Sequence, residues 1–231
     1  MSLFVAGYLP LDQRRMAENL YFAILHKIRR LTEQLDDVPE ELQGLDRMLS
    51  DMYFCNFSLF QSMPDSWAIK QLFPIMPIHR LRDRPTRHAV LGDITCDSDG
   101  KIEQFIDRRD IRRTLLLHPF DGTPYYLATF LIGAYQEILG DLHNLFGDTN
   151  AAHIDLNGDG QVVVEHILRG DTVNEVLDYV QFNGRELLNR LEAAVDAAIR
   201  EGRIDYKQAG AFLSFYEQAL NGYTYLEEPG D

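Results

Sequence analysis

The sequence predicts an α+β protein in which helical segments flank a central β domain. Apolar residues recur every three or four positions near both ends of the chain, which is the spacing of a helix face. Between them, short apolar runs alternate with polar residues and are separated by proline and glycine, as strands are. We therefore expect a helical segment over residues 1–52, a β domain over 53–182 and a C-terminal helical bundle over 183–231.

The first segment is expected to form a helical hairpin. Its first helix runs from Asp12 to Leu35, and residues 36–39 interrupt it. A second helix follows, because Pro39 suits a first helical turn and apolar residues then share one face. The two faces consist of Met16, Leu20, Ile24, Ile28, Leu31 and Leu35, and of Leu42, Leu45, Leu49 and Met52.

The central domain begins with an aromatic, partly alternating stretch, Tyr53 to Gln61, which predicts a strand. One helix is expected from Tyr135 to Phe146. The turn sequence Asn157 to Gly160 predicts a hairpin farther along. The other strands are expected at residues 87–95, 101–107, 113–118, 125–133, 150–156 and 161–168.

Three helices are predicted near the C-terminus, over residues 172–180, 184–201 and 205–220. Thr172 and Glu175 have the spacing of a capping box, in which side chains satisfy the free N–H groups of a helix start. The middle helix has the clearest apolar face, formed by Leu187, Leu191, Val195 and Ile199.

Composition argues against several functional classes. The 231 residues carry a net charge of −14, and nucleic-acid binding needs a basic surface, so nucleic acid is not an expected partner. Residues 125–135 form the longest nearly unbroken apolar run, shorter than the ~20 residues of a membrane helix, and no signal peptide opens the chain. Two cysteines are too few for a disulfide framework, which favours the cytoplasm. The abrupt helical start favours a piece of a longer protein.

Metal binding within this chain is not expected. The segment Asp155 to Gly160 is similar to the start of a calcium loop, but His166 stands at the twelfth position, where that loop needs a glutamate. The seven histidines are scattered, and none has another histidine or a cysteine at zinc-ligand spacing. His143, on the predicted central helix, is interpreted as a surface or satisfied core residue.

Cys96 is predicted to end a strand and has aspartates around it. It is either a small buried residue or a thiol that carries out chemistry. The aspartates disfavour the thiolate that a nucleophile needs, so a cysteine hydrolase is the weakest hypothesis. They do not disfavour a neutral thiol that donates a proton.

Tyr135 lies where a predicted strand changes to a helix, after Gly133 and Ala134. Free N–H groups at a helix start bind anions, and small residues allow close approach, so this tyrosine is a candidate phosphate ligand. The alternative is a tight turn with a packing tyrosine, and Glu137 in the first turn opposes an anion.

Four stretches resemble the C-terminal part of bacterial biosynthetic arginine decarboxylases. The pair Cys96-Asp97 is followed by Ser98-Asp99, which resembles the arginine branch rather than the related ornithine or diaminopimelate decarboxylases. The resemblance extends from about Tyr53 to the end and is weaker over the first fifty residues. Its stretches are NFSLFQSMPDSW at 56–67, DITCDSDGKI at 93–102, GAYQEILGDLHNLFGDTNAAHI at 133–154 and GYTYLEE at 222–228.

The resemblance implies a pyridoxal phosphate enzyme with an alanine-racemase-like TIM barrel, absent from this chain, and a following β-sandwich or β-barrel domain with helical additions. It implies that Tyr135 binds the cofactor phosphate, and that Cys96 and Asp97 reach into the partner subunit's site. The cofactor lysine belongs to the barrel, and Lys101, near Cys96, does not replace it. The chain alone is therefore expected to be inactive.

The implied reaction converts L-arginine to agmatine and CO2 in polyamine (spermidine) biosynthesis. Cys96 would donate a proton to the substrate's Cα, and Asp97, with Asp99 as the alternative, would pair with the guanidinium. The resemblance also implies a homo-oligomer, at least a dimer and a tetramer in the intact enzyme, and a magnesium requirement whose site no residue marks. The competing hypothesis is a non-catalytic interaction module derived from a decarboxylase domain.

Overall fold

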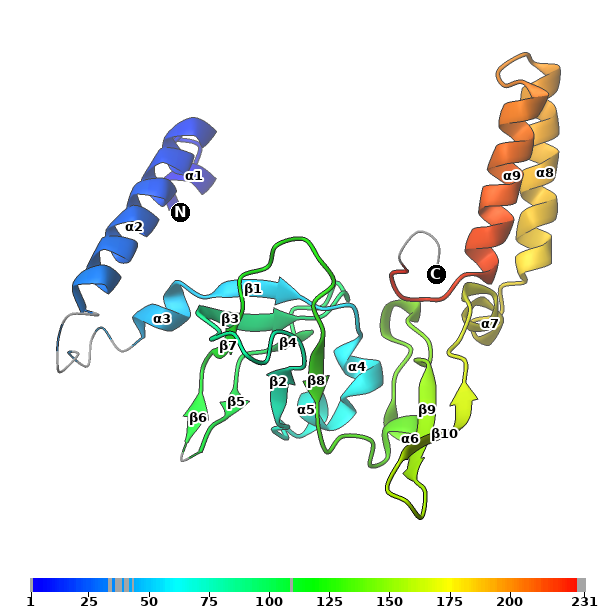
Figure 1. Ribbon diagram of the computed structural model, residues 1–231. Helices are drawn as coiled ribbons and strands as arrows, with labels where there is room; N and C mark the ends of the chain where they lie inside the picture. Colours follow the sequence, from blue (N-terminus) through cyan, green and yellow to red (C-terminus); the bar gives the residue numbers. More distant parts are fainter. Residues whose placement is uncertain are drawn as a thin grey trace. The chain divides into compact units, whose positions relative to one another are not determined.

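The structure is a computed structural model, and it describes residues 2–32, 35, 39, 42, 44–108 and 110–227, apart from the side chain of Glu137. Helices lie toward both ends of the sequence and short strands lie between them, so the predicted α+β class is confirmed (Figure 1). The chain forms two compact units, and each is assembled from three segments of the sequence.

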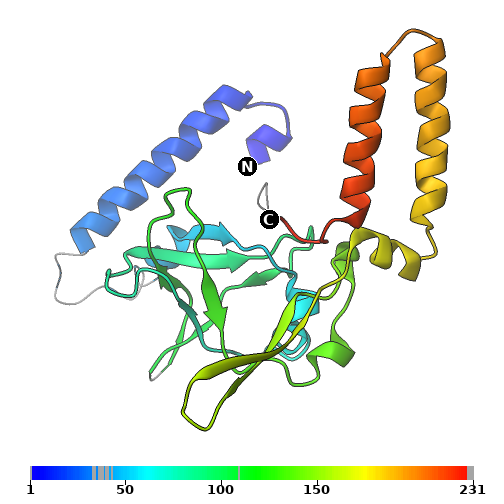
Figure 2. The ribbon, with the colours of Figure 1, turned by 45° about the vertical axis from the view of Figure 1, so that its right-hand side comes forward.

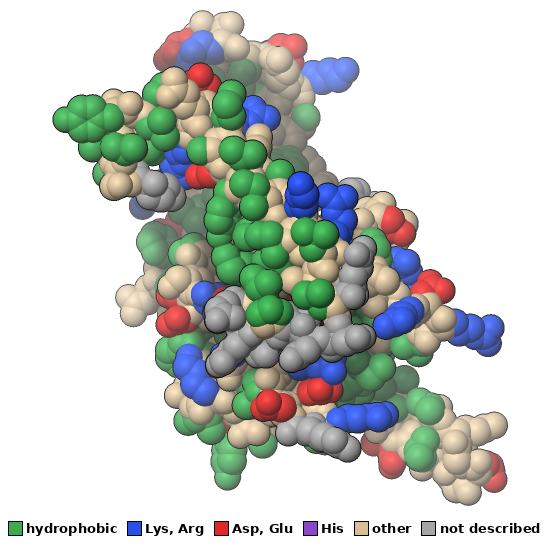
Figure 3. All heavy atoms as spheres, turned by 90° about the vertical axis from the view of Figure 1, so that its left-hand side faces the viewer, with side chains coloured by type: hydrophobic (Ala, Val, Ile, Leu, Met, Phe, Trp, Pro, Cys, Tyr) green, Lys and Arg blue, Asp and Glu red, His purple; other side chains and the backbone are tan. Residues whose placement is uncertain are grey.

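The first unit comprises residues 1–54, 72–92 and 101–131, and its sequence begins with helices. The short helix α1, Ser2–Val5, precedes α2, Leu11–Thr32, which confirms the long predicted helix. Met16, Leu20 and Ile24 on its apolar stripe are exposed. Figure 3 shows hydrophobic side chains gathered along this face.

The second predicted helix is shorter than expected. Helix α3 covers only Leu45–Met48, and strand β1, Asp51–Phe54, begins where the helix was expected to continue. Its predicted extension to Met52 is wrong, because Asp51 and Met52 pair with another strand. Residues 36–38, 40, 41 and 43, where this helix was expected to begin, lie outside the described residues.

A four-stranded sheet forms the core of the first unit. Its central strand is β3, Arg87–Gly92, whose Ala89, Val90 and Leu91 are buried. Strand β1 pairs with one edge of β3 in parallel, while β4, Lys101–Ile102, and β7, Leu115–Leu117, pair antiparallel with the other edge. Among the described strands no other pair is parallel, so these residues contain no TIM barrel, which needs eight parallel strands.

Two antiparallel ladders complete the first unit. They pair β2, Ile75–Pro77, with β8, Leu127–Thr129, and β5, Phe105–Ile106, with β6, Ile111–Arg112. The predicted strands at 87–95, 101–107, 113–118 and 125–133 are thus confirmed in place, but each is shorter or divided.

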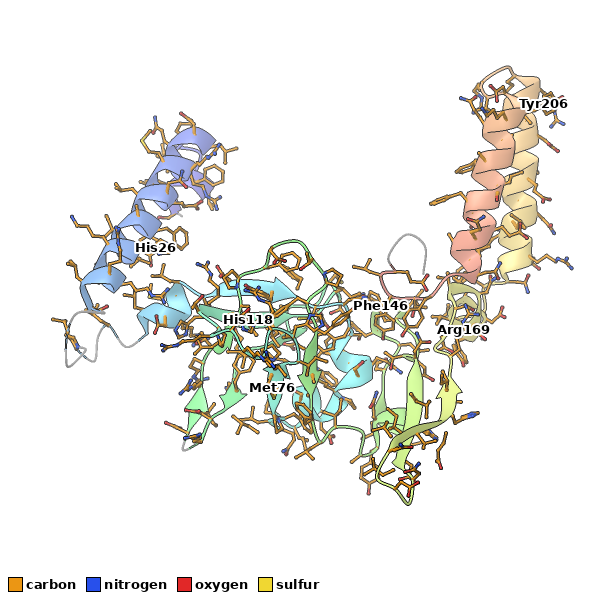
Figure 4. The ribbon with its side chains drawn as sticks, in the orientation of Figure 1. His26, Met76, His118, Phe146, Arg169 and Tyr206 are labelled. Carbon is orange, nitrogen blue, oxygen red and sulfur yellow. The ribbon has the colours of Figure 1, made fainter. Side chains whose placement is uncertain are left out.

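His118 is a buried polar residue of this unit, 2% exposed. Its Nδ1 lies 2.8 Å from the Tyr125 hydroxyl oxygen and its Nε2 lies 3.0 Å from the Asp83 carbonyl oxygen (Figure 4). Its own carbonyl accepts a hydrogen bond from the Tyr53 hydroxyl at 2.9 Å. Buried polar groups with partners on each side stabilise a fold, so His118 has a structural role.

The second unit comprises residues 55–71, 93–100 and 132–231. It contains the short helices α4, Leu59–Ser62, α5, Pro64–Ala68, and α6, Gln136–Leu139, and a 3-10 helix, His143–Leu145. Strands β9, Ala151–Leu156, and β10, Val162–Leu168, form the predicted hairpin.

The predicted C-terminal helices are confirmed as α7, Val173–Tyr179, α8, Gly184–Arg200, and α9, Tyr206–Asn221. Helices α8 and α9 lie side by side (Figure 2). The Thr172 N–H donates to Glu175 Oε2 at 2.7 Å, and the Glu175 N–H donates to the Thr172 hydroxyl, so the capping box is present. The Thr172 N–H and the Thr172 hydroxyl, which both donate to Glu175 Oε2, hold the pKa of the Glu175 carboxyl below its ordinary value.

The strand predicted over residues 53–61 is wrong beyond Phe54. Ser58 ends the extended backbone, and its hydroxyl accepts the Gln61 N–H at 3.3 Å as the N-cap of α4. Leu59 and Phe60 then bury their side chains from one short helix rather than from alternate positions of a strand.

Candidate functional site

The turn over residues 93–100 carries two predicted site residues, and a buried carboxylate organises it. Asp93 is 2% exposed. Its Oδ2 accepts the Leu59 N–H at 2.8 Å, and its Oδ1 accepts the N–H and the hydroxyl of Thr95 at 3.0 and 2.8 Å. A buried carboxylate is costly unless it accepts hydrogen bonds, and three donors supply them here. The bond from Leu59 connects the turn to the start of α4.

Gly100 closes the same turn. Its N–H donates to the Asp97 carbonyl at 3.2 Å, and its carbonyl accepts the Asp93 N–H at 2.8 Å. A Cβ atom on Gly100 would lie 2.6 Å from Asp93 Cγ and 2.7 Å from Thr95 Oγ1. Glycine is required because the backbone passes too close to the buried carboxylate for any side chain.

Cys96 lies in this turn, four residues beyond β3, and not at the end of a strand as predicted. Its side chain is exposed, so its interpretation as a small buried residue is wrong. The Cys96 N–H donates to Asn144 Oδ1 at 3.1 Å, and Asn144 Nδ2 donates to Cys96 Sγ at 3.4 Å. One amide therefore contacts both the backbone and the thiol of Cys96.

Asp97 lies beside a histidine. Its Oδ1 accepts the Asp99 N–H at 2.8 Å, and its Oδ2 lies 3.8 Å from His143 Nε2. The His143 ring packs on Phe60 with centroids 4.3 Å apart, and its Nε2 is buried without a hydrogen-bond partner among the described residues. The side chain is 29% exposed, so the expectation of a surface residue holds in part, whereas that of a fully satisfied core residue does not.

Asn144 contacts Cys96 in a segment that does not form the helix predicted over 135–146. Helix α6 ends at Leu139, and after it Asn144 and Leu145 have φ angles of 57° and 62°. A left-handed backbone costs roughly 1–2 kcal/mol per non-glycine residue, and asparagine tolerates it better than most. The helix prediction is thus wrong beyond residue 139.

Two residues that follow Asn144, Phe146 and Gly147, contact Thr224 and Tyr225 in the segment after α9. Phe146, labelled in Figure 4, packs on Tyr225 with ring centroids 5.2 Å apart. The Tyr225 hydroxyl donates to the Gly147 carbonyl at 2.9 Å, and the Thr224 hydroxyl accepts the Gly147 N–H at 3.1 Å. Burial raises the pKa of the Tyr225 hydroxyl, which therefore remains a donor at neutral pH.

Tyr135 has no bond to this cluster among the described residues. It precedes α6 with a φ of 60°, and its side chain is 74% exposed. Helix α6 has only four residues, which is too short for an N-terminal anion site, so what Tyr135 offers is an exposed phenol hydroxyl.

The described residues offer neither a metal site nor a buried lysine for a covalent cofactor link. No three His, Cys, Asp or Glu side chains among them gather as a metal site requires. The four lysines, Lys27, Lys70, Lys101 and Lys207, are exposed. Lys101 pairs with Glu103 at 3.4 Å. None of the helices in the described ranges combines the length and apolar character that crossing a membrane requires.

Sequence reasoning selected Cys96, Asp97 and Tyr135 but missed His143 and Asn144 as neighbours of the first two. Both missed residues lie inside the family-like stretch at 133–154, which was the available indication. Because both residues were expected on a regular helix, their contacts with Cys96 and Asp97 were not predicted.

Comparisons with known proteins match nearly the whole chain. A family model for the arginine decarboxylase helical bundle domain matches residues 1–46, and one for the arginine decarboxylase C-terminal helical extension matches residues 173–226. Biosynthetic arginine decarboxylases from Rhodopirellula baltica and Thermosynechococcus vestitus are 63% and 53% identical to it over 227 residues, which is 98% of this chain and 34% and 36% of those proteins.

A solved structure is also similar. The crystal structure of the biosynthetic arginine decarboxylase SpeA from Campylobacter jejuni matches with a TM-score of 0.78 and 35% identity, covering 99% of this chain and 36% of that one. The chain spans about a third of the length of the curated relatives it matches. It therefore belongs to the biosynthetic arginine decarboxylase family and corresponds to a C-terminal part of its members.

Proposed function

We propose that this chain supplies active-site residues to a pyridoxal phosphate-dependent decarboxylase that converts L-arginine to agmatine and CO2. The observation that carries the proposal is an exposed turn in which Cys96 is hydrogen-bonded to Asn144 and Asp97 lies beside His143, within a chain whose relatives are named biosynthetic arginine decarboxylases. When bound, pyridoxal phosphate supplies the electron sink that loss of a carboxylate requires.

Cys96 is proposed to donate the proton that the substrate's Cα needs after CO2 has left. Its sulfur accepts the Asn144 amide N–H at 3.4 Å, which leaves the S–H proton free to be donated elsewhere. Because the thiol is exposed, it can reach a group that lies outside this chain. Positioned proton donors typically accelerate a reaction by about 10²–10⁴-fold.

Asp97 is proposed to bind the substrate guanidinium. Its Oδ2 makes no hydrogen bond among the described residues, and its Oδ1 retains acceptor capacity beside the Asp99 N–H. A guanidinium presents parallel N–H donors that match the two oxygens of a carboxylate. Asp99, two residues farther along, remains the alternative.

Tyr135 is proposed to contact the cofactor phosphate. Its phenol is exposed and has no hydrogen-bond partner in the described part of the chain, which fits a donor to a phosphate oxygen. The lysines of this chain are exposed to solvent, so we place the covalent cofactor link in the barrel of the longer protein and expect this chain alone to be inactive. Cys96 and Asp97 would act in the partner subunit's site, which requires at least a dimer.

The competing hypotheses differ in what they require of Cys96. A cysteine hydrolase needs a base at the thiol, whereas the described contacts join Cys96 to Asn144 and place His143 beside Asp97. A non-catalytic module needs neither the thiol nor the carboxylate. Exposed apolar faces, such as the stripe on α2, favour that module as the second candidate.

The test is a chimera in which this chain replaces the matching C-terminal part of the Rhodopirellula baltica relative. We expect the chimera to form agmatine and CO2 from arginine, and this chain alone to form neither. In the chimera, Cys96→Ala should divert turnover from agmatine to oxidative by-products. Asp97→Asn should raise the KM for arginine about 10–100-fold, because a hydrogen bond to a charged group is lost, while the bound-cofactor absorbance stays unchanged.

Two variants serve as controls. Asp159→Asn, at the exposed tip of the β9–β10 hairpin, should change neither product nor KM. Asp99→Asn tests the alternative partner of the guanidinium. If the KM for arginine increases in Asp99→Asn and not in Asp97→Asn, the guanidinium binds Asp99 instead. Full agmatine yield from Cys96→Ala refutes the proton-donor role. A folded, cofactor-loaded chimera without agmatine refutes the enzyme assignment and favours the non-catalytic module.

A further inference from the structure

We infer that Asn144 is a positioning residue, which fixes the Cys96 thiol and stabilises its sulfur once the proton has left. This inference rests on the proposed role of Cys96. In the described residues, Asn144 alone is bonded to Cys96, through its Oδ1 at 3.1 Å from the backbone nitrogen and its Nδ2 at 3.4 Å from Sγ.

The orientation of the amide follows from the backbone. The Cys96 N–H can only donate, so the amide oxygen of Asn144 must face it. The amide nitrogen then lies on the side of the sulfur, where it can only donate. The sulfur is therefore an acceptor in this contact, and its own proton points away from Asn144.

The contact becomes stronger as the proton leaves. In the proposed step the S–H bond breaks, a C–H bond forms at the substrate's Cα, and the resulting thiolate later regains a proton from water. A hydrogen bond to an ionised acceptor is roughly twice as strong as one to a neutral acceptor. A donor already in place lowers the barrier, because it stabilises the developing charge more than the ground state.

The backbone at this position is strained, which supports a functional role. Asn144 has φ 57° and ψ 24°, and Leu145 beside it has φ 62°. Such strain persists only where the surroundings fix it, and it occurs disproportionately at active sites. The bonds of Tyr225 and Thr224 to Gly147 fix the chain directly after this segment.

Two substitutions distinguish the contribution of the Asn144 side-chain amide from that of its left-handed backbone. Asn144→Gly removes the amide, and glycine adopts a left-handed backbone without cost. Asn144→Asp keeps an acceptor for the Cys96 N–H but replaces the donor at Sγ with an oxygen that binds the thiol proton. Asn157→Gly is the matched control, because Asn157 Oδ1 accepts the N–H groups of Asp159 and Gln161 at the hairpin tip.

The first measurement is the rate at which iodoacetamide alkylates Cys96 in this chain between pH 6 and 10. Both Asn144 variants should react roughly 3–10-fold more slowly at pH 7.5, with the midpoint of the profile at higher pH, while Asn157→Gly matches the parent. Purely structural damage would instead leave that midpoint in place, because the thiol is already exposed in the parent. An unchanged profile in Asn144→Asp overturns the inference, even if Asn144→Gly fails to fold.

The second measurement is the product partition of the chimera. Asn144→Gly should divert turnover from agmatine as Cys96→Ala does, with the KM for arginine changed by less than about 2-fold, because only the step at sulfur is affected. If Cys96→Ala has no effect, the proposed function fails. If Cys96→Ala diverts turnover and Asn144→Gly does not, the positioning role alone is wrong.

Discussion

Replacing Asp93 with asparagine should lower the free energy of unfolding of the second unit by about 2–4 kcal/mol. The carboxylate is buried and accepts three hydrogen bonds, from the Leu59 N–H and from the N–H and hydroxyl of Thr95. An asparagine keeps one acceptor oxygen, but its NH2 group must face a donor on one side. At least one charge-assisted bond, worth about 1.5–3 kcal/mol, is lost, and two donors then oppose each other.

The assay is urea unfolding followed by tryptophan fluorescence. Trp67 is the single tryptophan of the chain and packs edge-on against Phe60 with centroids 5.2 Å apart. Phe60 follows Leu59, whose N–H binds Asp93, so this reporter lies close to the perturbation. Asp97→Asn is the matched control, because that exposed carboxylate accepts a backbone N–H in the same turn. It should cost less than about 1 kcal/mol, and equal losses in the two variants would refute burial as the cause.

Three further substitutions or conditions test the surroundings of the site. Tyr225→Phe should cost about 1–2 kcal/mol in the same unfolding assay, because the Gly147 carbonyl loses its donor; no loss would contradict that bond's importance. Gly100→Ala should cost about 1–3 kcal/mol, since its Cβ would meet Asp93, and wild-type stability would show that the turn can shift. Burial raises the pKa of the Cys55 thiol to about 11 from an ordinary 9.0, so iodoacetamide at pH 8 should modify exposed Cys96 first, as mass spectrometry of the digests can check. This raised pKa also means that the Cys55 contribution to stability is complete below about pH 9 and is lost as the pH rises toward 11, a loss that Cys55→Ser should remove.

Elements whose deciding interactions are local were predicted correctly. The capping box at Thr172 and Glu175 starts α7 within four residues of sequence, and Asn157 to Gly160 form the tip of the β9–β10 hairpin. The face of α8 that was predicted to be apolar is buried at Val195. In the capping box and the hairpin tip the spacing of a few residues determines the backbone, because the partners lie within one or two turns.

Elements whose deciding partners lie far along the chain were predicted wrongly. Residues 55–61 have an aromatic, alternating pattern, yet Leu59 starts a helix. The Leu59 N–H donates to the side chain of Asp93, which lies 34 positions away in the sequence. The helix predicted past Leu139 is replaced by a strained segment, held downstream by residues that follow α9. Helical spacing in the sequence does not reveal such long-range bonds.

The sequence by itself determined the α+β class, the C-terminal helices and the family to which the motifs at Cys96 and Asp97 point, since caps, turns and apolar spacing act over short distances. Only the tertiary structure decided that Asn144 bonds to Cys96 and that His143 lies beside Asp97. Cys96 and Asn144 are 48 positions apart, and their contact depends on a left-handed backbone that a regular helical pattern conceals. Long-range packing stabilises that backbone, and it becomes visible only when the chain is folded.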